Sequence, residues 1–195
     1  MGEKELNEIN FLKKSLKKKF IESAEPMNQV DYTLENYNKL FPGGKVSTPI
    51  GEISLGKHQF EKLKAYDRKN LLGAMHQTLT DPIAVINEND NRGKAQLFSK
   101  SFKNGKEKIK VVLSAIANIK GDNISISTHR RNINNIINKI KKPADLLYEK
   151  QTSGNVGTAG TDSYSPNLAI SGDTQSTDKE IPINSNIPQN VPKVK

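Results

Sequence analysis

The spacing of apolar side chains changes near residue 130, which predicts a strand followed directly by a helix. Isoleucine alternates with polar residues in residues 123–129, the period of a strand with one buried face. One face of this strand would carry Ile124, Ile126 and Thr128, and the other Ser125, Ser127 and His129. The spacing of three and four residues that follows is that of one helix face, with Ile133, Ile136, Ile137 and Ile140. We expect this helix to pack on the isoleucine face of the strand.

Two longer runs predict a hairpin upstream of this unit. Residues 95–102 and 109–118 flank Asn104-Gly105, a dipeptide that favours a tight turn between antiparallel strands. Phe98, Lys100 and Phe102 share one face of the first strand. The two phenyl rings favour burial of this face. Lys100 must therefore either extend its ammonium group to solvent or have a functional role on the buried face.

These runs predict an α+β fold, with helices packed on one face of a small antiparallel sheet of about four strands. A helix is expected over residues 57–79, and residues 5–21 predict an amphipathic, basic N-terminal helix. The end of the chain is rich in Ser, Thr, Asn, Gly and Pro, which is typical of disorder. We therefore expect a helical extension at residues 1–40, a compact domain at 41–148 and a disordered low-complexity tail at 149–195.

Positive charge is concentrated in the predicted compact domain. The 195 residues carry a formal net charge of +9, and residues 44–148 hold 19 Lys and Arg against 9 Asp and Glu. This excess favours an acidic partner, with nucleic acid or an anionic membrane surface as the leading classes. The longest apolar run is too short to span a membrane, and the N-terminus is a poor signal peptide, so we expect no stable membrane insertion.

Few catalytic motifs are present. The absence of Cys excludes disulfides and a cysteine nucleophile, and the three histidines show no metal-ligand spacing. Gly-rich phosphate loops, a serine-hydrolase elbow and an obvious carboxylate pair are also missing. We therefore expect no metal site and no cofactor. What remains is a set of imidazole, hydroxyl and cationic side chains: His58, Lys62, Lys100, Ser101, Ser127, Thr128, His129, Arg130 and Arg131.

This set suits a phosphodiester substrate. An imidazole acts as general base or acid near neutral pH, and Lys and Arg stabilise charge that develops on phosphate oxygens. RNA carries its own nucleophile, the 2′-hydroxyl, so its cleavage to a cyclic phosphate needs no metal. Each residue also has an ordinary alternative role: His129 as a surface or capping histidine, His58 and Lys62 as solvated helix positions.

Several short motifs occur in a characteristic order along the chain. They are Leu40-Phe41-Pro42-Gly43-Gly44, Thr48-Pro49-Ile50-Gly51-Glu52, Leu55-Gly56, Gln59-Phe60-Glu61-Lys62-Leu63, Thr78-Leu79-Thr80-Asp81-Pro82, Lys100-Ser101-Phe102 and Ser127-Thr128-His129. In this order they resemble the phage barnase-EndoU-colicin-RelE-like nuclease domain, over roughly residues 40–148. The resemblance implies helices followed by a four-stranded antiparallel sheet, and a metal-independent ribonuclease that commonly acts as a toxin or effector of phages and mobile elements.

Carried over by position, the resemblance implies roles for five residues. His129 would be general base or acid, Lys62 and Lys100 would contact the scissile phosphate, and Ser127 and Thr128 would donate hydrogen bonds to it. We expect the remaining members of the set to bind substrate: His58, Ser101, Arg130 and Arg131. The implied partners are RNA, tRNA included, and an immunity or antitoxin protein, and the implied location is the bacterial host cytoplasm or delivery with a phage or mobile element. Two alternatives stay open, a non-catalytic nucleic-acid-binding module and a phage structural or interaction protein.

Overall fold

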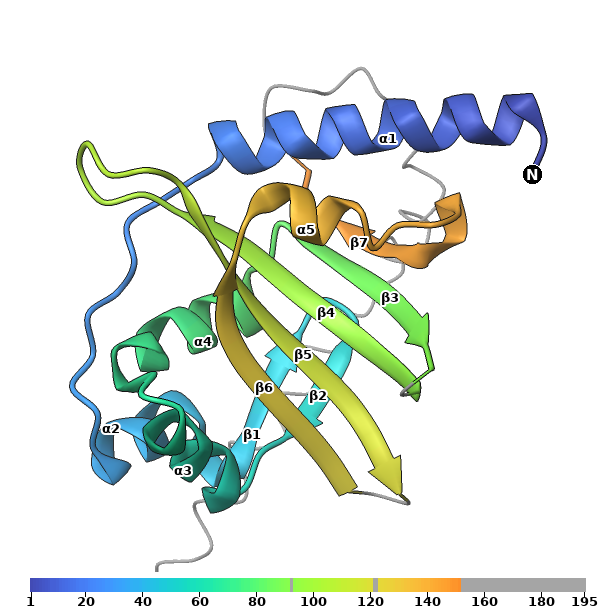
Figure 1. Ribbon diagram of the computed structural model, residues 1–195. Coiled ribbons are helices and arrows are strands. Elements are labelled where there is room, and N and C mark those ends of the chain that lie inside the picture. The colour runs from blue at the N-terminus through green and yellow to red at the C-terminus, as the bar shows by residue number, and fades with distance from the viewer. Residues whose placement is uncertain (92, 121–122, 152–195) are drawn as a thin grey trace, which may run out of the picture. The chain divides into compact units, whose positions relative to one another are not determined.

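An antiparallel sheet of five strands lies at the centre of the part of the chain that the structure describes (Figure 1). The structure is a computed structural model, and it describes residues 1–91, 93–120 and 123–151. The strand order is β6-β5-β4-β3-β7, with bounds β3 (Ala84–Asp90), β4 (Gly93–Phe102), β5 (Lys110–Lys120), β6 (Asn123–Arg131) and β7 (Leu146–Glu149). A separate hairpin is formed by β1 (Lys45–Thr48) and β2 (Gly51–Ser54).

Helices surround this sheet, which confirms the predicted α+β class. They are α1 (Glu3–Glu22), α2 (Leu34–Leu40), α3 (Lys57–Ala65), α4 (Leu72–Thr80) and α5 (Ile133–Ile137), with short 3₁₀ turns η1 (Pro42–Gly44), η2 (Lys69–Leu71) and η3 (Pro143–Asp145). The sheet has one strand more than the four expected, because Leu146–Glu149 forms β7 and pairs with β3.

Both faces of the sheet are covered by helices. Neighbouring residues of a strand point to opposite faces. Val85 and Phe98, paired across β3 and β4, belong to a core shared with α2, α3, α4 and the β1–β2 hairpin. The next pair, Ile86 and Leu97, belongs to a second core shared with α1 and α5. The expectation of helices on one face is therefore wrong, because these strands carry apolar side chains on both sides.

Helix α1 is part of the second core rather than a separate extension. Leu16 and Phe20 are fully buried in it, and the hydroxyl of Ser101 donates a hydrogen bond of 2.6 Å to the carbonyl oxygen of Phe20. Lys19 forms an ion pair of 2.6 Å with Glu149 of β7. Residues 1–150 form one compact unit, so the boundary expected after residue 40 does not separate two domains.

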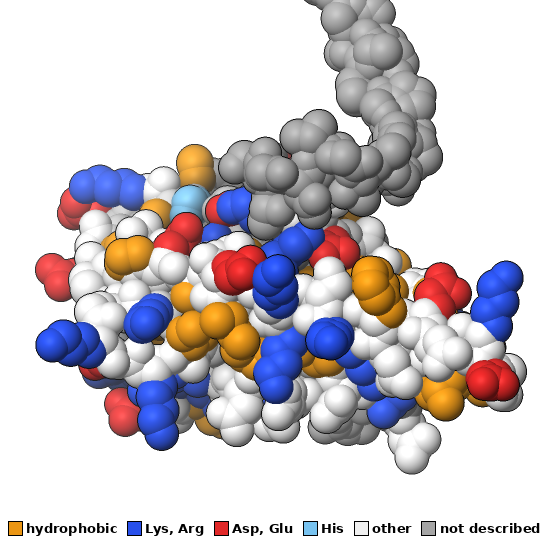
Figure 2. Space-filling model, turned by 90° about the horizontal axis from the view of Figure 1, so that it is seen from above, with side chains coloured by type: hydrophobic (Ala, Val, Ile, Leu, Met, Phe, Trp, Pro, Cys, Tyr) orange, Lys and Arg blue, Asp and Glu red, His pale blue; other side chains and the backbone are white. Residues whose placement is uncertain are grey.

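The face of the molecule on which α1 lies carries both positive and negative side chains (Figure 2). Figure 2, seen from above the view of Figure 1, shows basic side chains interspersed with acidic and hydrophobic ones rather than gathered in one basic patch. None of the described helices is long and apolar enough to cross a membrane.

The helix expected over residues 57–79 is two helices. Between α3 and α4, Asp67 has a φ of 54°, a left-handed conformation that a right-handed helix cannot continue through. The break carries Arg68 toward the sheet, where its Nη1 donates a hydrogen bond of 3.1 Å to the carbonyl oxygen of Thr128. This change of direction places a cation beside β6.

Most of the isoleucines after residue 132 are buried, but the expectation that they pack on the isoleucine face of β6 is wrong. Ile126 of β6 is paired with Ile116, which belongs to the core shared with α4 on the other face of the sheet. Ile136, Ile137 and Ile140 are buried in the core that includes α1. The side chains of Ile124 and Ile126 lie outside the described part of the structure, as do residues 152–195, where a disordered tail is expected.

Gly73 marks a close approach between α4 and the linker that follows α1. A Cβ at this position would collide with the carbonyl oxygen of Asn28 and lie 3.0 Å from Cγ2 of Val30. Alanine favours a helix over glycine by about 1 kcal/mol, but steric overpacking costs about 1–3 kcal/mol. The clash is with backbone atoms, which cannot move aside as a side chain can, so we expect Gly73→Ala to lower the free energy of unfolding by about 2 kcal/mol, measured by urea denaturation. A gain in stability would contradict the packing of this linker on α4.

Candidate functional site

The free edge of β6 brings together several of the predicted site residues. This strand is the last in the sheet order, and α3 packs beside it (Figure 1). Lys62 of α3 and Ser127 and Thr128 of β6 line one small cleft, together with Tyr66 and Arg68. The cleft has a volume of about 10 Å³, so it can receive one group of a ligand rather than a whole nucleotide.

Arg68 is held at this edge by three contacts. Its backbone N–H donates a hydrogen bond of 2.7 Å to the carbonyl oxygen of Leu63, and its Nη1 donates to that of Thr128. Its guanidinium lies over the ring of Tyr66, 5.0 Å from the centroid. No carboxylate among the described residues forms an ion pair with Arg68. The edge of β6 therefore carries a fixed positive charge that is available to an anion.

His129 lies next to Ser127 on the same side of β6. Its Nδ1 is 3.5 Å from the Ser127 hydroxyl oxygen, at the outer limit of a hydrogen bond. Burial, and then the positive charges of Arg131 and Arg68, lower the pKa of His129 to about 4. The imidazole is therefore neutral at neutral pH, and it lies within electrostatic reach of two arginines.

Lys62 is the second titratable group of this region with a shifted pKa. Its side chain is partly buried, and this burial lowers the pKa of its ammonium group below the ordinary value. An ammonium group with a lowered pKa gives up a proton more readily. Lys62 is thus suited to donate a proton, whereas the neutral His129 is suited to accept one.

The hydroxyl of Thr128 is directed into the protein. It shares a hydrogen bond of 2.9 Å with the hydroxyl of Ser114, and the residue is only 3% exposed. The expected hydrogen bond from this hydroxyl to a phosphate is therefore not available. Thr128 instead contributes its carbonyl oxygen, which anchors Arg68.

Lys100 and Ser101 are not part of this site. Lys100 is 1% exposed, and its Nζ lies 2.8 Å from the carbonyl oxygen of Asp81, 2.9 Å from Oδ2 of Asp81 and 3.3 Å from Oε1 of Glu25. Ser101 is fully buried beneath α1. Buried polar groups require internal partners, and both residues have them. This placement corrects the predicted contacts of Lys100 with the scissile phosphate and of Ser101 with substrate.

The remaining predicted residues lie around the site without lining the cleft. His58 is exposed on α3. Arg130 and Arg131 follow His129 on β6 and, as neighbours in a strand, they point to opposite faces. Arg131 acts on His129 through its charge, whereas Arg130 lines a different pocket.

Arg68 was not anticipated from the sequence. It follows the break between α3 and α4, where a continuous helix was expected, so no periodicity points to it. The one local signal is the Tyr66-Asp67 pair, since Asp tolerates the left-handed conformation that ends α3.

The described residues contain no group of three or more His, Asp or Glu side chains that could hold a metal ion. No protein-family model matches the sequence, no curated protein matches it, and no solved structure matches the fold. The resemblance to the phage nuclease family, and the activity that it implies, therefore stay predictions.

Proposed function

We propose that this protein is a metal-independent endoribonuclease with its active site at the free edge of β6. The observation that supports the proposal most is the environment of His129. Its imidazole has a pKa of about 4, lies beside the hydroxyl of Ser127 and is close to the charges of Arg68 and Arg131. A neutral base next to fixed positive charges suits the attack of an adjacent hydroxyl on a phosphate, because the base accepts the proton and the charges stabilise the phosphate oxygens.

In this mechanism His129 removes the proton of the 2′-hydroxyl. The 2′-oxygen forms a bond to the neighbouring phosphorus, the bond from phosphorus to the 5′-oxygen breaks, and the products are a 2′,3′-cyclic phosphate and a 5′-hydroxyl. Arg68 and Arg131 stabilise the added negative charge on the phosphate oxygens. Because an imidazole with a pKa of about 4 is a poor reservoir of protons at neutral pH, Lys62 supplies the proton to the leaving 5′-oxygen.

The reaction has two direct signatures. Labelled single-stranded RNA should be cut in the presence of EDTA, with cyclic phosphate at the new ends. The same sequence made with 2′-deoxyribose should stay intact, because the nucleophile is missing. RNA binding without chelator-resistant cleavage would contradict the ribonuclease and favour a non-catalytic nucleic-acid-binding module.

Lys62 and Lys64 provide a matched pair of variants on α3. Lys62 lines the cleft, whereas Lys64 is exposed and does not line it. We expect Lys62→Ala to lower the cleavage rate by about 100-fold, since proton donation to the leaving group is lost. Lys64→Ala removes the same charge from the same helix, and the rate should stay within about twofold of the unmodified protein. Equal losses in the two variants would indicate a general effect of charge and contradict the role of Lys62.

A further inference from the structure

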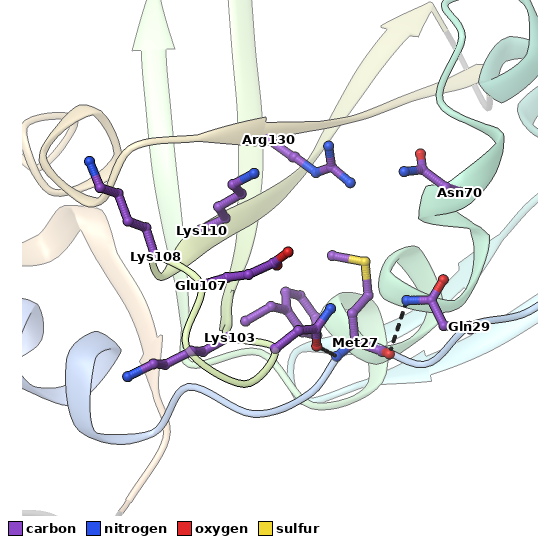
Figure 3. A pocket seen from close by; sticks show the side chains of 10 residues that line it. Met27, Gln29, Asn70, Lys103, Glu107, Lys108, Lys110 and Arg130 are labelled. Carbon is purple, nitrogen blue, oxygen red and sulfur yellow. Dashed lines mark hydrogen bonds between the residues drawn. The ribbon is translucent and has the colours of Figure 1, made fainter.

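A second pocket, with a volume of about 250 Å³, opens where the β4–β5 turn meets the linker between α1 and α2 (Figure 3). Met27 and Phe102 form its apolar floor and pack together in a small core. Its other lining residues are mainly polar or basic. This composition differs from that of an apolar ligand pocket and suits a charged ligand.

Lys110 and Arg130 carry the charge that faces this pocket. Arg130 is paired with Val112, two residues along β5 from Lys110, so both side chains project from the same face of the sheet. Figure 3 shows them next to each other, with the carboxylate of Glu107 below Lys110. Neither cation forms an ion pair with any carboxylate among the described residues. Two neighbouring positive charges repel, and an anion between them would lower that energy.

The walls of the pocket are fixed by hydrogen bonds between its two sides. The side-chain oxygen of Asn104 accepts a hydrogen bond of 3.2 Å from the backbone N–H of Met27. The N–H of Lys103 donates a bond of 3.0 Å to the carbonyl oxygen of Glu25. These contacts join the β4–β5 turn to the linker, so the pocket exists before any ligand binds.

The pocket lies next to the candidate active site along β6. The segment after α3 borders both, because Arg68 contacts Thr128 at the cleft and Asn70 lines the pocket with Arg130. His129 and Arg130 are neighbours in β6, so their side chains point to opposite faces of the sheet. Because β6 is the edge strand, an RNA chain that passes around this edge can place one phosphate at His129 and a second one at the pocket.

We infer that this pocket binds a second phosphate of the RNA chain that is cleaved at the edge of β6. The choice of RNA rests on the proposed function. Lys110 and Arg130 donate hydrogen bonds to the phosphate oxygens, and the amide of Asn70 lies across the pocket from them (Figure 3). Contacts of this kind fix the position of the chain and carry no base preference. Glu107 opposes binding through its negative charge.

Binding can be measured separately from cleavage with a labelled, fully 2′-O-methylated single-stranded RNA in fluorescence anisotropy. We expect the double variant Lys110→Ala/Arg130→Ala to weaken binding by about tenfold and to reduce the slope of log K against log salt by about 0.7, since one neutralised phosphate contributes about 0.7 on a single strand. The control Lys39→Ala/Lys45→Ala also removes two charges, from exposed ion pairs outside the pocket, and should leave the slope unchanged.

Glu107→Gln tests the same pocket in the opposite direction. Removal of its carboxylate should tighten RNA binding by about threefold, a gain that misfolding cannot produce. Unchanged affinity and salt slope in the Lys110→Ala/Arg130→Ala protein would overturn the inference, even if cleavage is normal. Binding that depends on these two residues, in a protein that cuts no RNA, would support the pocket and contradict the ribonuclease.

Discussion

His129→Ala is expected to lower the rate of chelator-resistant RNA cleavage by about 10²–10⁴-fold, the usual contribution of a general base. The substitution removes the neutral imidazole that takes the 2′-hydroxyl proton and leaves the charges of Arg68 and Arg131 in place. RNA binding should therefore change much less than the rate. The measurement is single-turnover cleavage of labelled RNA in EDTA, with the urea unfolding midpoint as the control for folding.

The pH dependence of the unmodified protein provides a readout that a purely structural role of His129 would not produce. Protonation removes the base, so the rate should fall as the pH decreases through the pKa of His129, about 4. An ordinary histidine would lose activity near pH 6.5. Arg131→Ala removes one of the charges that lower this pKa, so the acidic limb should move to higher pH. A limb near pH 6.5 in the unmodified protein would contradict the assignment of His129.

Lys100→Met is expected to lower the free energy of unfolding by about 3 kcal/mol, measured by urea denaturation. The lysine is 1% exposed and joins Asp81 of the α4–β3 connection to Glu25 of the linker after α1. Burial raises the pKa of Asp81, but hydrogen bonds from Lys150 and Lys100 outweigh it and hold the pKa below its usual value. Breaking a buried ion pair usually costs about 3–5 kcal/mol. The expected loss of stability is at the lower end of this range, because the carboxylates of Asp81 and Glu25 are partly exposed.

Lys150→Met is the matched control, since this lysine binds the same carboxylate oxygen. Its Nζ is 2.7 Å from Oδ2 of Asp81, but its side chain is 36% exposed. The cost should therefore be about 1 kcal/mol or less. Equal costs for the two substitutions would contradict a central structural role of Lys100. Loss of cleavage in a Lys100→Met protein that remains folded would restore the catalytic role predicted from the sequence.

The two lysines Lys62 and Lys100 show where sequence patterns stop being informative. The shared face of Phe98, Lys100 and Phe102 already indicated a conflict between burial and charge. Nothing in the pattern showed that Asp81 and Glu25 would resolve it, because these residues are 19 and 75 positions away. The same uncertainty applied to Lys62, whose position on an exposed helix face was equally compatible with simple solvation.

The sequence by itself determined the local elements of this protein. The alternation of apolar and polar residues in 123–129 predicted β6, and the spacing of isoleucines after residue 132 predicted α5. Asn104-Gly105 predicted the turn between β4 and β5. These features follow from the repeat of a strand or a helix, which depends only on neighbours along the chain. The concentration of positive charge also followed directly from composition.

Only the tertiary structure decided which of the chemically suitable side chains meet. It covered both faces of the sheet, buried Lys100 and Ser101, and brought Lys62, Ser127 and the unanticipated Arg68 to the edge of β6. The reason is physical: such contacts depend on strand order, on the left-handed break at Asp67 and on which helix packs on which face. Strand order and helix packing depend on residues far apart in the sequence, so the spacing of residues along the chain does not predict them.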